Sequence, residues 1–144
     1  MQINNILVIG SGAMGSQIGM LAALAGYRTT IQDIAGESLA AAREQLVSRM
    51  DNSVSKGRLD RAEADAALAR LHFTISLQEG AANADFVIEA ATEKLEIKRA
   101  IFAALDAAAP AHAILATNSS TLGSSKVASA TNRPKQVCNM HFFN

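Results

Sequence analysis

Short apolar runs alternate along this chain with longer stretches in which apolar residues recur at helical spacing. Residues 6–9, "ILVI", are uniformly apolar and stop at Gly10, as expected for a strand that is covered on both faces. Residues 14–26 are rich in Ala, Leu and Met and close on a glycine, which predicts a helix with that glycine just past its end. The β-branched residues within 27–33 predict a second strand.

The next segment predicts two helices in succession. Apolar positions recur at spacings of three and four residues from 37 to 54, which is the pattern of an amphipathic helix. The sequence "SKGRLD" then breaks the pattern, and Asp60 is a suitable cap for a second helix over residues 61–71. Two helices are more than a minimal crossover between strands requires, so we interpret them as an inserted helical hairpin.

The remaining chain continues the alternation. Strands are predicted at 73–76, 85–90, 113–117 and 136–143, with a brief helical segment after the first, a helix at 94–109 and a short helix near 123–130. Strands that alternate with helices indicate a parallel sheet covered by helices. We therefore predict an α/β fold of the Rossmann-like, doubly wound type, with a mainly parallel sheet, the inserted helical hairpin, and a single domain over residues 1–144.

Composition and charge exclude several classes of partner. The chain has 13 basic and 13 acidic residues, so its formal net charge gives no reason to expect nucleic acid or an anionic membrane as a partner. The start of the chain, "NNILVIG", shows neither a leader pattern nor an apolar run long enough to span a bilayer. Cys138, the single cysteine, lies among apolar residues and fits a reducing compartment. We expect a soluble, cytoplasmic protein with no bound metal.

The sequence "GSGAMG" lies directly between the first strand and its helix. Glycines at its first, third and sixth positions permit a tight turn, the approach of a pyrophosphate, and close packing of helix on strand. The candidate cofactor loop is Gly10, Ser11, Gly12, Ala13, Met14 and Gly15. Asp33 ends the second strand, where its carboxylate would bind both ribose hydroxyls and repel a 2′-phosphate, which favours NAD over NADP. A simple tight turn and an FAD site remain alternatives at this point.

Polar residues also follow the later strands. Glu93 and Lys98 come after the fourth strand, either as solvated residues or at the ligand-binding edge of the sheet. Ser119 or Ser120 either caps a helix or holds a nicotinamide ring or a substrate oxygen. His141 is predicted on the last strand among apolar neighbours, as a structural residue or as a catalytic one.

Four segments together carry a resemblance to a known family. They are "VIGSGAMG" at 8–15, "VIEAATEKLEIKRAIFAALD" at 87–106, "ILATNSSTL" at 114–122 and "HFFN" at 141–144. From end to end the chain resembles the NAD-binding domain of 3-hydroxyacyl-CoA dehydrogenases. The resemblance favours NAD over FAD as the cofactor. It implies an oxidoreductase of fatty acid metabolism (β-oxidation) that converts a (3S)-3-hydroxyacyl-CoA to the 3-oxoacyl-CoA, or the reverse.

The same resemblance implies roles for individual residues. His141 corresponds to the base that removes the proton of the substrate's 3-hydroxyl, and Ser120 to a residue that hydrogen bonds near the reacting oxygen and the nicotinamide. Lys56, in the break between the two inserted helices, falls where the family places a basic contact to coenzyme A. The cofactor-contacting positions beyond the glycine loop are Asp33, Glu93, Lys98, Ser120 and Asn144.

The resemblance also implies that the natural polypeptide continues beyond Asn144. The family carries a proline there, then a glutamate that orients the histidine, then a helical C-terminal domain with substrate contacts and most of a homodimer interface. Two other functions remain open: a β-hydroxyacid dehydrogenase, whose members typically lack "HFFN" and use a later lysine, and a nucleotide-binding module without turnover.

Overall fold

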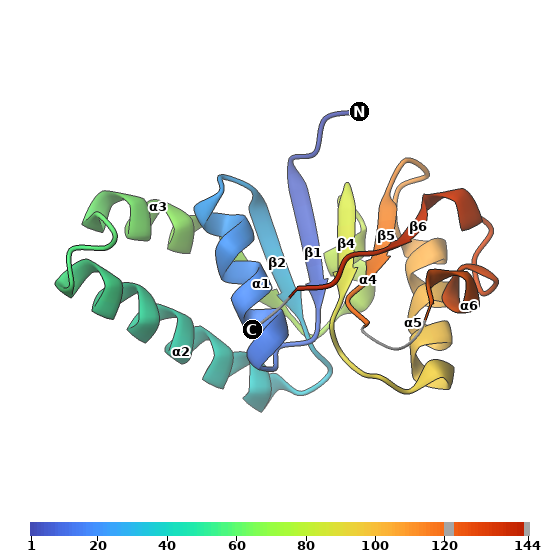
Figure 1. Cartoon of the computed structure of the whole chain (residues 1–144), viewed down its shortest axis with the longest axis horizontal. Coiled ribbons are helices and arrows are strands. Elements are labelled where there is room, and N and C mark those ends of the chain that lie inside the picture. Colours follow the sequence, from blue (N-terminus) through green and yellow to red (C-terminus); the bar gives the residue numbers. More distant parts are fainter. Residues whose placement is uncertain (120–122, 143–144) are drawn as a thin grey trace.

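Among the described residues, six parallel strands form one sheet (Figure 1). The computed structural model describes residues 1–119 and 123–142. The strands are β1 (Asn5–Ile9), β2 (Arg28–Gln32), β3 (Leu71–Thr74), β4 (Phe86–Glu89), β5 (Ile114–Thr117) and β6 (Val137–Asn139). Their order is β3-β2-β1-β4-β5-β6, so the direction of winding reverses between β1 and β4. In open α/β sheets ligands bind at such a reversal, beyond the carboxyl ends of the strands.

Helices cover the sheet on both faces. They are α1 (Ala13–Leu24), α2 (Gly36–Ser55), α3 (Arg61–Arg70), α4 (Leu77–Ala81), α5 (Leu95–Ala108) and α6 (Ser124–Ala128), with a 3₁₀ turn at Pro134–Gln136. Helices α1, α2 and α3 lie on one face, in front of the sheet and to its left in Figure 1, and α4, α5 and α6 lie on the other. This arrangement confirms the predicted doubly wound fold and its inserted helical hairpin.

The alternation of side chains along β1 builds a separate core on each face. Leu7 packs with Phe102 and Leu105 of α5, whereas Val8 packs with Ile18 of α1 and with residues of the helical hairpin. Strands buried on both faces read as continuous apolar runs, which is why "ILVI" shows no polar alternation. The two cores fix the strand ends relative to the helix termini that border the site.

The last strand is shorter than predicted. It ends at Asn139, and His141 lies after it rather than on it. The physical reason is that its partner β5 stops at Thr117, and the ladder closes with the hydrogen bond from the Met140 N–H to the Thr117 carbonyl, at 3.0 Å. The third strand is also shifted: it covers Leu71–Thr74 and pairs with β2, while Ser76, predicted as strand, caps α4 with its hydroxyl.

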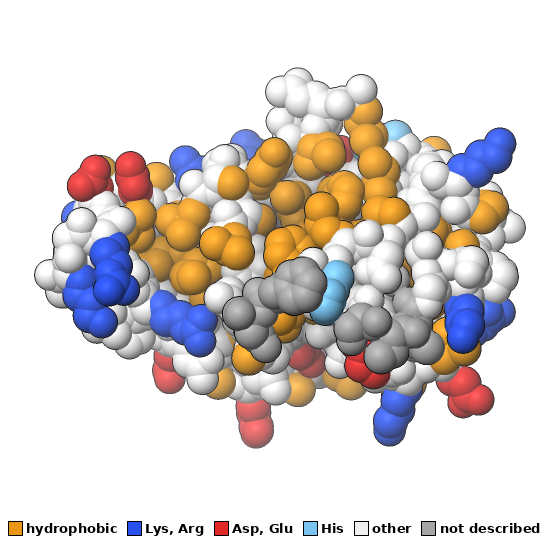
Figure 2. Space-filling model, viewed as in Figure 1, with side chains coloured by type: hydrophobic (Ala, Val, Ile, Leu, Met, Phe, Trp, Pro, Cys, Tyr) orange, Lys and Arg blue, Asp and Glu red, His pale blue; other side chains and the backbone are white. Residues whose placement is uncertain are grey.

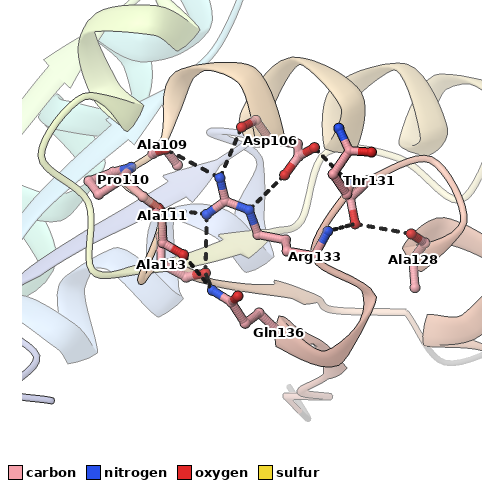
Figure 3. A network of polar contacts seen from close by, with 10 residues as sticks. Asp106, Ala109, Pro110, Ala111, Ala113, Ala128, Thr131, Arg133 and Gln136 are labelled. Carbon is pink, nitrogen blue, oxygen red and sulfur yellow. Dashed lines mark hydrogen bonds and ion pairs between the residues drawn. The ribbon is translucent and has the colours of Figure 1, made fainter.

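Charged side chains hold the amino edge of the sheet, where the strands begin. Arg133 donates from Nε to the Asp106 carboxylate at 2.6 Å and from its terminal nitrogens to main-chain carbonyls at the end of α5 and the start of β5 (Figure 3). These carbonyls belong to Asp106, Ala109, Pro110 and Ala113. Because the last carbonyls of a helix lack intrahelical partners, Arg133 in effect caps α5 from a distant part of the chain.

Candidate functional site

The glycine loop joins β1 to α1 at the reversal of the sheet. Gly10 has φ +105°, and a Cβ there would lie 2.8 Å from the Ala90 carbonyl oxygen. A Cβ on Gly15 would lie 2.0 Å from the carbonyl oxygen of Gly10, so close packing of helix on loop requires glycine. A Cβ on Gly12 would meet nothing within 4 Å. The first and last glycines are therefore required by the fold, whereas the middle one borders open space.

That open space is a cavity of about 470 Å³ above the loop. Its walls come from the glycine loop, Asp33, α2 and the segment after β4, with Gly10, Ser11, Gly12, Ala13, Asp33, Ser38, Ala41, Ala42, Gln45, Ala90 and Ala91 as lining residues. Gly12 is the N-cap of α1 and provides no side-chain hydrogen bond to the first turn. Main-chain N–H groups at a helix start, together with the helix dipole, favour an anion, so the cavity suits a pyrophosphate.

Asp33 lies at the end of β2 on the wall of the same cavity. Its Oδ2 accepts hydrogen bonds from the Ser11 N–H at 2.9 Å and the Ser11 hydroxyl at 2.8 Å, and its Oδ1 accepts one from the Ala35 N–H at 3.1 Å. Partial burial alone would raise the pKa of Asp33, but the hydrogen bonds from Ala35 and Ser11 outweigh it and lower that pKa. The carboxylate therefore stays ionised, as an acceptor for ribose hydroxyls requires.

A second cavity, of about 320 Å³, adjoins the first and shares Ala90 and Ala91 with it. It contains His141, with Met14, Thr92, Glu93, Asn118 and Phe142 as further lining residues. The two cavities together form a groove across the carboxyl ends of β1 and β4, which we call the cofactor groove. One end holds Asp33 and the other holds His141, so the groove brings together residues that the sequence predicts for a single site.

Hydrogen bonds from the loop after β5 hold the wall around His141. The Ser119 hydroxyl donates to the Glu93 carboxylate at 2.9 Å, and the Asn139 side-chain amide donates to the Ser119 carbonyl at 3.0 Å. Ser119 is 1% exposed, and the N-cap of α6 is Gly123, so its hydroxyl is not a helix cap. The alternative in which Ser119 caps a helix is therefore wrong.

Phe142 anchors the segment that follows β6. This segment crosses in front of β4 toward α1 (Figure 1), and Phe142 packs against the core on the α1 face. With Ile18, Ile88 and Met140 it lines an apolar cavity of about 290 Å³, on a face of the molecule where hydrophobic side chains gather (Figure 2). His141 is thus carried on a segment anchored by Phe142, which borders both this apolar cavity and the cofactor groove.

A buried charged network lies beneath the groove. Lys98 and Glu89 form an ion pair, both with 0% of the side chain exposed, and the Thr117 hydroxyl donates to the same carboxylate oxygen at 3.0 Å. The other oxygen of Glu89 accepts from the N–H groups of Ala91 at 2.8 Å and Thr92 at 3.3 Å. Glu89 therefore fixes the main chain of the loop that forms the groove's shared wall.

Several predicted residues lie elsewhere. Lys98 is neither solvated nor on the wall of the groove, because its ammonium group is buried on Glu89 and Thr117. Lys56 is exposed at the C-cap of α2, and the connection between α2 and α3 forms the left end of the molecule in Figure 1, away from the sheet. Ser120 and Asn144 lie outside the described residues.

The sequence reasoning missed residues that act through tertiary contacts. Glu89, Asn118 and Asn139 border or support the groove, yet the sequence pattern gives none of them a role of its own, although Glu89 and Asn118 lie within segments that carry the family resemblance. A carboxylate at the end of an apolar strand, as in "FVIEA", is the signal that points to Glu89, since a buried charge needs partners. Among the described residues, no cluster of histidine, cysteine and acidic side chains fits a metal ion. In the same part of the chain, no helix has the length and apolarity to cross a bilayer.

The comparisons with known proteins agree with this geometry. The family described as "3-hydroxyacyl-CoA dehydrogenase, NAD binding domain" matches residues 5–144. A probable 3-hydroxybutyryl-CoA dehydrogenase of Bacillus subtilis is 38% identical over 100% of this chain and 50% of its own length. The 3-hydroxyadipyl-CoA dehydrogenase of Escherichia coli is 37% identical over 99% of this chain and 30% of its own length.

Solved structures show the same likeness. The crystal structure of 3-hydroxybutyryl-CoA dehydrogenase from Escherichia coli is 36% identical and superposes with a TM-score of 0.97, over 100% of this chain and 30% of that one. The chain thus spans half the length, or less, of these relatives. The glycine loop, the ionised Asp33 and the groove fit an NAD cofactor, and the chain belongs to the 3-hydroxyacyl-CoA dehydrogenase family, of which it holds the NAD-binding domain.

Proposed function

We propose that this chain binds NAD along the cofactor groove and, as part of a longer protein, oxidises a (3S)-3-hydroxyacyl-CoA to the 3-oxoacyl-CoA or catalyses the reverse. The observation that carries the proposal is the adjacency of the two cavities, which share Ala90 and Ala91 and hold Asp33 at one end and His141 at the other. A bound dinucleotide is long enough to extend from one end of the groove to the other. A dehydrogenase also needs a proton acceptor beside the nicotinamide, and His141 lies at the end opposite Asp33.

The groove gives the cofactor a direction. The Asp33 carboxylate accepts from the hydroxyls of the adenosine ribose, and the start of α1 faces the pyrophosphate. The nicotinamide end then lies in the cavity of His141 and Glu93. Ser120 and Asn144 are proposed to contact the cofactor on the basis of the family resemblance. Lys98 is proposed to act through Glu89, whose carboxylate holds the main chain of the loop after β4.

The protein's part in the reaction is proton transfer and orientation. His141 accepts the proton of the substrate's 3-hydroxyl as the C3–H bond breaks, and it returns a proton to the oxygen in the reverse direction. NAD supplies the acceptor for the hydride that leaves carbon 3. Ser120 donates a hydrogen bond near the reacting oxygen. Because His141 lies on the open side of the groove, the acyl-CoA reaches it from solvent or from a further part of the protein.

Lys56 is proposed as a contact for a phosphate of coenzyme A, because it is a basic, exposed residue at the end of α2. The family resemblance further supports a homodimer of the longer protein and a role in β-oxidation. The single cysteine, Cys138, fits a reducing compartment and supports a cytoplasmic location. The chain carries 13 basic and 13 acidic residues, so its net charge gives no electrostatic reason to expect nucleic acid as a partner.

The binding half of the proposal is tested by titration calorimetry with NADH and NADPH. We expect the unaltered chain to prefer NADH. Asp33→Ala should lower the affinity for NADH about 10-fold or more and reduce the preference for NADH over NADPH. The variant lacks both the acceptor for the ribose hydroxyls and the charge that repels a 2′-phosphate. Asp51→Ala, which removes a half-exposed carboxylate from α2, is the matched control and should leave both affinities unchanged. Equal affinity of the unaltered chain for the two dinucleotides would contradict the proposal.

A further inference from the structure

We infer that Asn118 is a positioning residue for His141: its side chain fixes the main chain that carries the histidine against the wall of the cofactor groove. The inference rests on the proposed function, in which His141 is the proton acceptor. Asn118 follows β5 directly and lines the same cavity as His141. The sequence pattern marks it only as the amide of the polar loop "ATNSST" and gives it no role toward His141.

Asn118 itself is held firmly. Its N–H donates to the carbonyl of Glu89, the last residue of β4, at 2.8 Å, so its main chain continues the pairing of β4 and β5 beyond the strands. The carboxylate of Glu89 is in turn completely buried on Lys98 and Thr117. The side chain of Asn118 therefore extends from a rigid part of the sheet.

From this base the side chain reaches the segment after β6. The N–H of Phe142 donates to Oδ1 of Asn118 at 2.8 Å. The last ladder hydrogen bond of β6 runs from the Met140 N–H to the Thr117 carbonyl, at 3.0 Å. His141 is the one residue between these two tethered N–H groups, so the two hydrogen bonds together set the position and direction of its main chain.

The hydrogen bond also fixes the orientation of the amide. A main-chain N–H is only a donor, so the oxygen of Asn118, and not its nitrogen, must face Phe142. An aspartate has the same shape and offers an oxygen at the same place. A serine keeps a polar side chain but is too short to reach. These two replacements separate the effect of the hydrogen bond from that of polarity.

Loss of this tether should act on the position of His141 rather than on the cofactor. A misplacement of about 1 Å in a reacting group can cost on the order of 10²-fold in rate. We expect Asn118→Ala to lower kcat by about 10- to 100-fold while it changes the KM for NADH less than about threefold, because an interaction that serves only the transition state affects kcat. Asn118→Asp should retain most of the rate.

The experiment has a structural arm and a kinetic arm. In this chain, hydrogen exchange measured by NMR should show the Phe142 amide exchanging at least about 10-fold faster in Asn118→Ala, and near the unaltered rate in Asn118→Asp. The amide of Leu115, within β5, serves as the internal reference. In a form of the protein long enough to turn over a short 3-oxoacyl-CoA, kcat and KM are measured for the same variants. Asn52→Ala, an exposed asparagine of α2, is the control in both arms.

These measurements test the positioning role of Asn118 separately from NAD binding. Faster exchange at Phe142 with a lower kcat, both restored by aspartate, supports the inference. Unchanged exchange, or faster exchange with an unchanged kcat, overturns it. If Asn118→Ala does not fold, Asn118→Ser takes its place and is judged by the same two measurements. Failure of the unaltered chain to bind NADH would overturn the proposed function, while exchange at Phe142 would still show whether Asn118 holds the segment.

Discussion

The two edges of the sheet use polar side chains in different ways. At the amino edge, Asp85 accepts from the N–H groups of Asn4 and Asn5, both at 2.9 Å, and pairs with His112, while Arg133 binds Asp106 and four carbonyls. These groups hold the protein's own main chain. At the carboxyl edge, the glycine loop and its helix start face a cavity instead. Polar groups at the amino edge are thus paired within the protein and stabilise the fold, whereas those at the carboxyl edge face a cavity in which a ligand can bind.

This contrast has a physical origin in the direction of the chain. Each helix that follows a strand begins at the carboxyl edge, so the positive ends of the helix dipoles and the unpaired N–H groups collect there. Each helix that leads back into a strand ends toward the amino edge, where carbonyls need donors such as Arg133. Substitutions at the amino edge should therefore affect stability alone, and substitutions in the groove should affect binding.

Lys98 does not follow this division, because it lies at the carboxyl edge yet is completely buried. We therefore expect its substitution to affect stability. Lys98→Met leaves the Glu89 carboxylate buried without its cation, and we expect a loss of about 3–5 kcal/mol in the free energy of unfolding. Urea denaturation followed by circular dichroism measures this loss. The double variant Lys98→Met/Glu89→Leu should be less destabilised than the single one, since no lone charge remains. A single variant as stable as the unaltered chain would show that the pair is not buried in solution.

Arg133 tests the amino edge. Arg133→Ala removes a side chain that is 11% exposed. Asp106 then keeps only the hydrogen bond from the Asn132 N–H, and the carbonyls at the end of α5 lose their donor, so we expect a loss of about 2–4 kcal/mol in the free energy of unfolding. Its NADH affinity, measured where the variant is folded, should be unchanged within about twofold. Arg61→Ala is the matched control: its ion pairs with Asp51 and Asp65 are half-exposed or more, and such exposed pairs contribute little to the free energy of unfolding. Similar losses for the two arginines would contradict the prediction.

The sequence predicts the carboxyl edge better than the amino edge because the signals there are local. The glycine loop and Asp33 follow from spacing along one strand–helix–strand unit, and the fold follows from the alternation of apolar runs. Arg133 has partners 20 to 27 residues away, all but one of them main-chain carbonyls, which no residue pattern reveals. The misplaced strand at His141 has the same cause, since β6 ends where a separate strand, β5, ends.

Contacts between residues far apart in the sequence explain why the sequence did not reveal the roles of Lys98 and Asn118. Lys98 reads as a solvated residue because lysine is almost never buried unless it is paired. Its partner Glu89 lies nine residues earlier, at the end of a strand, and only the packing of α5 on the sheet brings the two together. Asn118 is similar: "ATNSST" marks a polar loop, but which side chain reaches the histidine segment depends on where β6 ends.

Gly12 tests the groove without disturbing the fold. Gly12→Ala places a methyl group in open space, so the free energy of unfolding should change by about 1 kcal/mol at most. The same methyl group would stand where the pyrophosphate approaches the main chain, and we expect NADH affinity to fall about 10-fold or more, which is about 1.4 kcal/mol. Gly36→Ala, at the start of α2, has its nearest contact at 4.0 Å and is the control that should bind NADH normally. Unchanged affinity in Gly12→Ala would place the phosphates elsewhere.

The smallest expected effect concerns the pair of Asp85 and His112 at the amino edge. The hydrogen bond from His112, followed by those from Asn4 and Asn5, lowers the pKa of Asp85 below its ordinary value of 3.8. A lowered pKa in the folded state contributes stability above the unfolded pKa, and this contribution is lost as the pH falls through the folded pKa. His112 is 51% exposed, so His112→Ala should cost only about 0.5–1 kcal/mol at pH 6.

The difference in free energy of unfolding between His112→Ala and the unaltered chain should then shrink as the pH falls below about 4. A protonated Asp85 carries no negative charge to attract His112. Urea denaturation at pH 6, 5, 4 and 3 measures both free energies. His72→Ala, an exposed histidine of β3, is the control for losing an imidazole and should show no such narrowing. A difference that stays constant down to pH 3 would mean that His112 stabilises the amino edge by packing rather than through the Asp85 carboxylate. NADH affinity at pH 6 should be the same in all three proteins, since neither histidine borders the groove.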